Sequence, residues 1–134
     1  MSRAWALQVL YRWEMAGAGT TLDDALIHTL ATRKVSPRRM GHLRAVIQTL
    51  AAELPRVDEA LSAALDNWRL DRVSVVDRSV LRIAGAELLF MRHDVPGPVA
   101  IQEGVRLAER YGGTASPRFV NGVLDAVLRQ NAES

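Results

Sequence analysis

The chain has 134 residues, of which 49 % are apolar, and this length and composition suit one domain with its own hydrophobic core. It has no cysteine, which excludes a disulfide framework, a thiolate nucleophile and a cysteine zinc site, and no apolar run reaches the roughly 18 to 20 residues of a membrane span. A net charge of +2 does not by itself indicate a nucleic-acid-binding protein. The composition, together with the lack of a signal-peptide pattern, favours a soluble, cytoplasmic protein.

Apolar residues recur at the helical period through the first half of the chain. A first helix is predicted from Ala4 to Met15, and the segment from Gly17 to Thr21 ends it. Ser36-Pro37 is a typical helix start, and Leu54-Pro55 is expected to break the helix that follows. The helices predicted in this half span residues 4–15, 22–31, 37–53 and 57 to about 67.

The second half shows the same helical pattern with clearer start and stop signals. Ser74 and Asp77 match a capping box at the head of a helix over residues 74–93, and Gly112-Gly113 ends the next one. Ser116 is the predicted N-cap of the last helix. These three helices span residues 74–93, 99–111 and 116 onward, and the polar end at 131–134 is expected to be frayed. The chain is therefore predicted to form one domain over residues 1–134, an all-α, compact seven-helix bundle.

The sequence contains one candidate pair of catalytic carboxylates, Glu87 and Glu103. Glu87 lies on the apolar stripe of its helix, where burial would raise its pKa toward values useful in acid–base chemistry. The alternative is an ion pair with an arginine such as Arg82 or Arg106, which is the commoner role of a buried acid in a helical bundle. No metal-binding histidine spacing and no glycine-rich phosphate loop accompanies the pair. We therefore predict that the protein is not an enzyme and uses no metal or cofactor.

Arginine supplies 16 of the 17 positive charges, and its planar fork of donors suits phosphate groups and base edges. No acidic residue occurs between positions 33 and 52. The start of this segment holds a cluster of cations: Arg33, Lys34, Arg38, Arg39 and Arg44. Two interpretations remain open, namely an additional basic patch for nucleic acid and a solvated face that reflects compositional bias.

The stretch "SPRFVNGVLDAVL" places Arg118 and Phe119 in the first turn of the last helix. Free N–H groups and the helix dipole there favour an anion such as phosphate, and Arg118 adds a formal charge. Phe119 has two possible roles, as a plate on which a single-stranded RNA base stacks or as a core side chain. The sequence pattern alone does not decide between them.

Tryptophan and tyrosine offer further candidate contacts. Trp5, Trp13 and Trp68 lie near arginines and could stack on bases, although we favour a role as lids over the edge of the core. Tyr11, with Arg12 beside it, suits a protein interface as well as a core edge.

Longer motifs resemble a known family. "VLRIAGAELLFMRHDVPGPVAIQEGVRLAERYGG" and "SPRFVNGVLDAVL" are similar to the C-terminal half of the NusB family of bacterial transcription antitermination factors. "RAWALQVLYRWE" and "NWRLDR" fit the same family. The resemblance extends over essentially the whole chain, and it is strong over residues 66 to 128 and weak from 17 to 65.

The resemblance implies a seven-helix NusB fold and a role in RNA binding. Members of the family pair with ribosomal protein NusE on the single-stranded boxA element of ribosomal RNA leader transcripts, and the complex helps RNA polymerase resist termination. Arg3, Arg118 and Phe119 match RNA-contacting positions, and Arg72 of "NWRLDR" joins the predicted RNA-binding set. Tyr11 and Asp77 match positions at the NusE interface, although Asp77 also has the capping-box role.

Two other interpretations keep the fold. The domain resembles the RNA-binding module of ribosomal RNA cytosine methyltransferases, but a 134-residue chain without cysteine lacks the catalytic domain and nucleophile that those enzymes need. A homodimeric protein-interaction module with a masked or weakened RNA surface is the main alternative. Many relatives carry a longer arginine-rich leader, of which only Arg3 has a counterpart here, so we expect fewer phosphate contacts and a lower electrostatic affinity.

Overall fold

A computed structural model describes residues 2–17, 19–66 and 68–131 of the chain. These residues form six α-helices and one short 3-10 helix, and no strand occurs among them. The elements in chain order are α1 (Ser2–Ala16), α2 (Leu22–Thr32), α3 (Pro37–Ala64), η1 (Leu70–Arg72), α4 (Val75–Phe90), α5 (Gly97–Tyr111) and α6 (Ser116–Gln130). The predicted all-α class is confirmed, whereas Ala18, Asn67 and the predicted frayed residues 132–134 lie outside the described residues.

The predicted count of seven helices is wrong because α3 joins two of them. Glu53 has non-helical dihedral angles (φ −123°, ψ 17°), so the helix kinks there, but it resumes at once through Pro55. Proline lacks an N–H and clashes with the preceding turn, and the kink at Glu53 relieves both problems. Both halves bury apolar side chains, Leu50 before the kink and Val57 after it, so core packing keeps the bent helix continuous.

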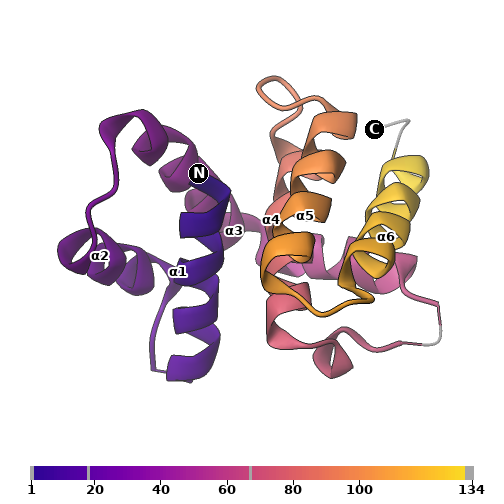
Figure 1. The fold of residues 1–134 in the computed structure, drawn as a ribbon, viewed down its shortest axis with the longest axis horizontal. Helices are drawn as coiled ribbons and strands as arrows, with labels where there is room; N and C mark the ends of the chain where they lie inside the picture. Colours follow the sequence, from indigo (N-terminus) through magenta and orange to yellow (C-terminus); the bar gives the residue numbers. More distant parts are fainter. Residues whose placement is uncertain (1, 18, 67, 132–134) are drawn as a thin grey trace.

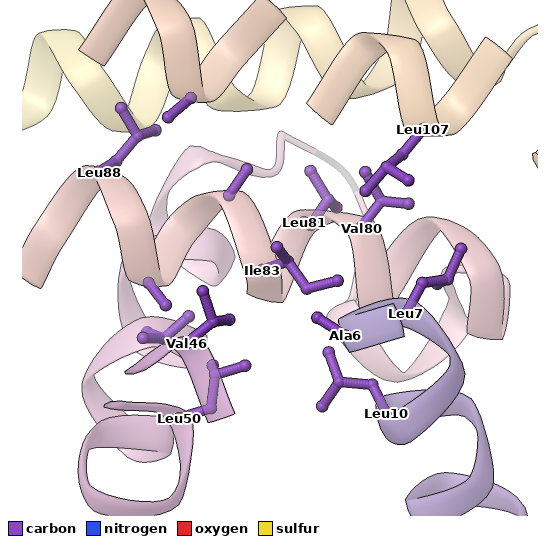
Figure 2. Close-up of a cluster of buried hydrophobic side chains, with 14 of the residues drawn as sticks. Ala6, Leu7, Leu10, Val46, Leu50, Val80, Leu81, Ile83, Leu88 and Leu107 are labelled. Carbon is purple, nitrogen blue, oxygen red and sulfur yellow. The ribbon is translucent and has the colours of Figure 1, made fainter. Parts of the chain in front are cut away.

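Helix α4 lies at the centre of the molecule, between α1 on one side and α5 and α6 on the other (Figure 1). Every residue from Ser79 to Leu88 is buried, because α1, α3, α5 and α6 all pack against this helix. Figure 2 shows Leu81 and Ile83 of α4 among side chains of α1, α3 and α5, including Leu10, Leu50 and Leu107. The burial of these side chains supplies the main favourable free energy of folding.

Helices α5 and α6 form an antiparallel pair that covers one face of α4 (Figure 1). Gly104 makes this close packing possible, since a Cβ atom there would lie 3.0 Å from Leu124 Cδ1 and 3.3 Å from Ala84 Cβ. Within the described ranges, no helix is long and apolar enough to cross a membrane.

Candidate nucleic-acid interface

A groove of about 460 Å³ lies where the segment before α4 meets the turn between α5 and α6. Its walls include Trp68, Arg72 and Asp77 on one side and Phe119 with the turn residues 113–116 on the other. We call it the Phe119 groove. It brings together three residues that the sequence singled out for binding, Arg72, Asp77 and Phe119, from positions up to 47 apart in the chain.

The α5–α6 wall of the Phe119 groove depends on a tight turn. A Cβ atom at Gly112 would lie 2.6 Å from Ser116 Oγ and 2.9 Å from the carbonyl oxygen of Ala108, so only glycine fits there. The Ser116 hydroxyl accepts a hydrogen bond from the Gly113 N–H at 2.9 Å. The predicted N-cap role of Ser116 is therefore wrong, because Ser116 is the first helical residue and Ala115 is the N-cap, without a side-chain cap bond.

The start of α6 is a weaker anion site than the sequence suggested. The N–H groups of Ser116 and Phe119 already donate to the carbonyls of Gly113 and Ala115, and Pro117 has no N–H. Arg118 is exposed to solvent. Phe119 is half-buried, because its ring packs against the core and also lines the groove. Phe119 is thus partly a core side chain, and the face that lines the groove is open to a ligand.

The other wall begins with Trp68, whose side chain is 60 % exposed. The prediction that the tryptophans are lids over the core is wrong for this residue. Trp5 and Trp13 do pack against the core, and the Arg82 guanidinium lies 5.4 Å from the centre of the Trp13 ring. Arg72, also in this wall, is exposed and forms no ion pair with any residue that the structure describes.

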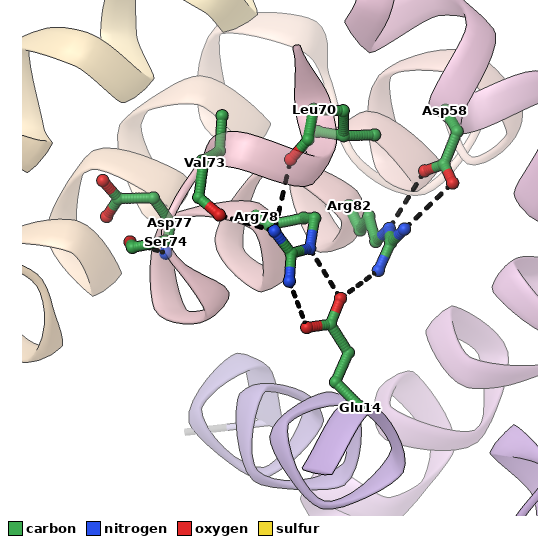
Figure 3. Close-up of polar contacts among 8 residues, drawn as sticks. All are labelled: Glu14, Asp58, Leu70, Val73, Ser74, Asp77, Arg78 and Arg82. Carbon is green, nitrogen blue, oxygen red and sulfur yellow. Dashed lines mark hydrogen bonds and ion pairs between the residues drawn. The ribbon is translucent and has the colours of Figure 1, made fainter. Parts of the chain in front are cut away.

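Arg78 and Arg82 of α4 form a network of ion pairs with Glu14 and Asp58, and Arg78 also holds the segment before α4 in place (Figure 3). Both oxygens of Glu14 accept hydrogen bonds from Arg78 at 2.6 Å, and Glu14 Oε1 also accepts one from Arg82 at 2.6 Å. Arg82 further donates to both oxygens of Asp58. Arg78 donates in addition to the carbonyl oxygens of Leu70 and Val73, on either side of η1.

Local hydrogen bonds at the start of α4 define the position of Asp77. The Ser74 hydroxyl accepts a hydrogen bond from the Asp77 N–H at 3.2 Å, which is one half of the predicted capping box, and no return bond from the Ser74 N–H to the Asp77 carboxylate is found in the described part of the chain. Asp77 Oδ1 is buried and has no hydrogen-bond partner within the described part of the chain. The capping contact is thus formed by the serine, and the Asp77 carboxylate is left beside the Phe119 groove.

Arg3 lies away from this groove, in an ion pair with Glu87. Its guanidinium donates to Oε1 and Oε2 of Glu87 at 3.0 and 2.8 Å, and its side chain is only 17 % exposed. His42 Nε2 lies 2.9 Å from Glu87 Oε2. Since Glu87 and Asp77 are ten residues apart on α4, the Arg3 pair and the Phe119 groove lie about 15 Å apart along that helix.

The electrostatics of Glu87 argue against acid–base catalysis. Burial by itself would raise the pKa of this carboxyl, but hydrogen bonds from His42 and Arg3 outweigh burial and lower the pKa. The favoured interpretation of Glu87, an ion pair with an arginine, is therefore confirmed, and the raised pKa of the catalytic alternative is not found. The partner is Arg3 and neither of the two suggested arginines: Arg82 pairs with Glu14 and Asp58, and Arg106 with Glu103. No cluster of three or more potential metal ligands is found among residues 2–17, 19–66 and 68–131.

A second groove, of about 600 Å³, lies along α1 and α2. Exposed Tyr11 and Met15 line it, together with Arg33, Val76 and Tyr111, and we call it the Tyr11 groove. Val76 belongs to the Tyr11 groove and the next residue, Asp77, to the Phe119 groove. The linings of the two grooves are therefore adjacent at the start of α4.

The basic cluster lies at the end of α2 and the start of α3, where all five cations are exposed. His42, within the same stretch, contacts Ser2 and Glu87, so this part of α3 lies near the N-terminal end of α1. Although Arg3 and the cluster are far apart in the sequence, they therefore lie in the same region of the structure. Arg33 is the one member of the cluster that lines the Tyr11 groove.

The described residues define a small all-helical protein with two open grooves on its surface. The chain belongs to the NusB family, whose family model matches residues 1–129. The resemblance of the sequence motifs is thereby confirmed. Because this is a family of transcription antitermination factors, the prediction that the protein is not an enzyme is confirmed as well.

Individual relatives resemble this chain in sequence and in structure. Transcription antitermination protein NusB of Anaeromyxobacter dehalogenans is 43 % identical over 127 residues, which cover 94 % of this chain and 87 % of the relative. The solved structure of T. maritima NusB superimposes with a TM-score of 0.87 at 35 % identity, over 98 % of this chain and 90 % of that one. A crystal structure of the antitermination factors NusB and NusE in complex with dsRNA matches with a TM-score of 0.82 at 25 % identity, over 96 % and 94 % of the two chains.

Proposed function

We propose that this protein is an RNA-binding transcription antitermination factor that pairs with NusE on the single-stranded boxA element of ribosomal RNA leader transcripts. The observation that carries the proposal is the Phe119 groove of this member of the NusB family, which Phe119 lines from one wall and Arg72, a cation without an ion pair in the described part of the chain, from the other. An aromatic plate with a nearby cation is a common way of binding single-stranded RNA. The assembly would act with RNA polymerase on nascent transcripts in the cytoplasm.

The predicted RNA-binding residues support this proposal to different extents. Arg72 and Phe119 share the groove, and Arg118 is an exposed cation next to Phe119 on α6. Arg3 is the weakest member of the set, because its guanidinium already neutralises the buried Glu87. A charge that is held in an internal pair contributes less to the attraction of phosphate than a free one.

We propose that NusE binds in the Tyr11 groove. Tyr11 and Tyr111 are both exposed there, and tyrosine is enriched in protein interfaces. Asp77 lies where the linings of the Tyr11 groove and the Phe119 groove are adjacent, a position from which a protein partner would reach the edge of bound RNA. This adjacency gives a physical reason for NusE to strengthen RNA binding, since RNA would then contact both proteins at once.

Fluorescence anisotropy of a labelled boxA-like RNA, titrated with the protein alone and with NusE, tests this function. We expect selective binding over a scrambled RNA and over the same sequence in a duplex, and tighter binding with NusE. Phe119→Leu keeps much of the apolar volume but removes the flat ring, so it should weaken binding about 5- to 150-fold without unfolding the bundle. Phe90→Leu, at a half-buried position that lines a different groove, is the matched control.

Unselective binding in both titrations would contradict the proposal. So would a Phe119→Leu variant that melts early but binds normally in its folded fraction, since Phe119 would then be only a core residue. If no RNA binds, the molecular mass in solution at several concentrations, with and without RNA, identifies a homodimer that masks the RNA surface.

We also propose that the cluster of Arg33, Lys34, Arg38, Arg39 and Arg44 adds salt-sensitive affinity that does not depend on RNA sequence. Each phosphate contact to single-stranded RNA adds about 0.7 to the slope of log K against log salt. Arg38→Glu/Arg39→Glu should therefore flatten that slope by about 1.4 while leaving the preference for boxA unchanged. Arg56→Glu/Arg129→Glu makes the same change in net charge at exposed positions of α3 and α6. If the two double variants gave equal slopes, the cluster would not be part of the RNA-binding surface.

A further inference from the structure

We propose that Trp68 is a base-stacking residue, which with Phe119 provides the aromatic surfaces of the Phe119 groove. The inference rests on the proposed RNA-binding function and adds a specific contact to it. Trp68 is the largest of the exposed apolar side chains in the described residues, with 60 % of its surface accessible. An indole has one of the largest apolar surfaces of any side chain, and its burial on folding is strongly favourable. An indole that stays in solvent beside a groove is therefore available to a ligand.

The surroundings of Trp68 favour a nucleic-acid base. Arg72 lies in the same groove and is free of ion pairs in the described part of the chain, whereas the neighbouring Arg69 is neutralised by Asp71 at 2.7 Å. Phe119 approaches the same groove from α6. Two aromatic side chains from different elements and one free cation match the combination of stacking and charge by which proteins hold single strands.

Hydrogen bonds from α4 anchor the segment that carries Trp68 and Arg72. Arg78 donates to the carbonyl oxygens of Leu70 and Val73, and its guanidinium is held by both oxygens of Glu14 at 2.6 Å. These bonds fix η1 against α4, and so define where the exposed residues of this wall lie (Figure 3). A contact surface that is ordered before binding loses less conformational entropy when the ligand arrives.

The experiment compares Trp68→Ala, Trp68→Leu and Trp68→Phe in the boxA anisotropy titration, without and with NusE. We expect the alanine and leucine variants to lose about 5- to 150-fold in RNA affinity and the phenylalanine variant to recover most of it, since a ring is what stacking requires. Ile27→Ala removes another exposed apolar side chain, from α2, and should bind RNA like the unchanged protein. Thermal melting of each variant checks that the bundle is folded.

A second readout reports on the indole of Trp68 directly. RNA should quench the tryptophan fluorescence of the unchanged protein, and this quenching should disappear in Trp68→Phe, which retains Trp5 and Trp13. RNA affinity and quenching that are unaffected by the Trp68 variants would overturn the inference, while a loss with Phe119→Leu would show that the proposed function still holds. A loss confined to the tightening by NusE would also overturn it and would identify Trp68 as a protein contact. If the unchanged protein binds no RNA in either titration, the proposed function and this inference fail together.

Discussion

Glu14→Ala is expected to lower the free energy of unfolding by about 3–5 kcal/mol, because it leaves buried arginines without their shared partner. The side chains of Arg78 and Arg82 are only 13 % and 10 % exposed, and Glu14 contacts both. Arg82 keeps Asp58, but Arg78 loses its one ion-pair partner among the described residues. Urea denaturation at pH 7 measures the effect, and Glu59→Ala, which removes an exposed acid from α3, is the control.

The loss in Glu14→Ala should also depend on pH. Burial opposes ionisation of Glu14, but its bonds to Arg78 and Arg82 prevail and lower its pKa below the ordinary value of 4.5. A lowered pKa in the folded state adds stability above pH 4.5 that disappears as the pH falls through the folded value. The difference between the unchanged protein and the variant should therefore shrink below about pH 4.5. A variant as stable as the control at pH 7 would show that the network contributes little net stability.

Arg3→Ala should destabilise the fold by about 3 kcal/mol at neutral pH, since it leaves the fully buried Glu87 carboxylate with His42 alone. In the unchanged protein the pKa of Glu87 is lowered, so its stabilising contribution is present above pH 4.5 and is lost as the pH falls. Without Arg3 the pKa of Glu87 is lowered less, so the variant gains less stability as the pH rises above 4.5. The destabilisation should thus be larger at pH 7 than at pH 4.

Chemical denaturation at the two pH values tests this, with Arg12→Ala, an exposed arginine of the same helix, as the control. Arg3→Ala/Glu87→Gln should recover part of the stability at pH 7, because no buried charge remains. RNA affinity measured well below the melting temperature separates the structural role of Arg3 from its predicted RNA contact. Equal stability of Arg3→Ala and Arg12→Ala at pH 7 would mean that the Glu87 pair is not needed for folding.

Features set by neighbouring residues could be predicted from the sequence. Ser36-Pro37 starts α3 and Ser74 caps α4, because a cap or a proline acts on the adjacent turn. Gly17, with φ +82°, follows the end of α1 where a break was expected. The resemblance of the motifs to one family then supplied the fold, which residue patterns alone do not specify.

Features set by distant contacts could not be predicted. Arg3 and Glu87 are 84 residues apart, and nothing in the local pattern of either residue indicates the other. Leu54-Pro55 was predicted to break the helix, but it only kinks it, because the shared core on both sides keeps α3 continuous. The exposure of Trp68 depends on how the chain turns around η1, which Arg78 of the next helix fixes through backbone carbonyls.

The close packing at Gly104 has a consequence for binding. The Phe119 groove lies between the start of α4 and the turn that follows α5, so its width follows from how closely α4 and α5 approach each other. Gly104 allows the close approach of α5 to α4 at Ala84, and of α5 to α6 at Leu124, from the interior. Exchanges of small and large side chains in this interior therefore change the groove without altering any residue that lines it. We thus expect a substitution at Gly104 to alter binding in the groove although every residue that lines it stays the same.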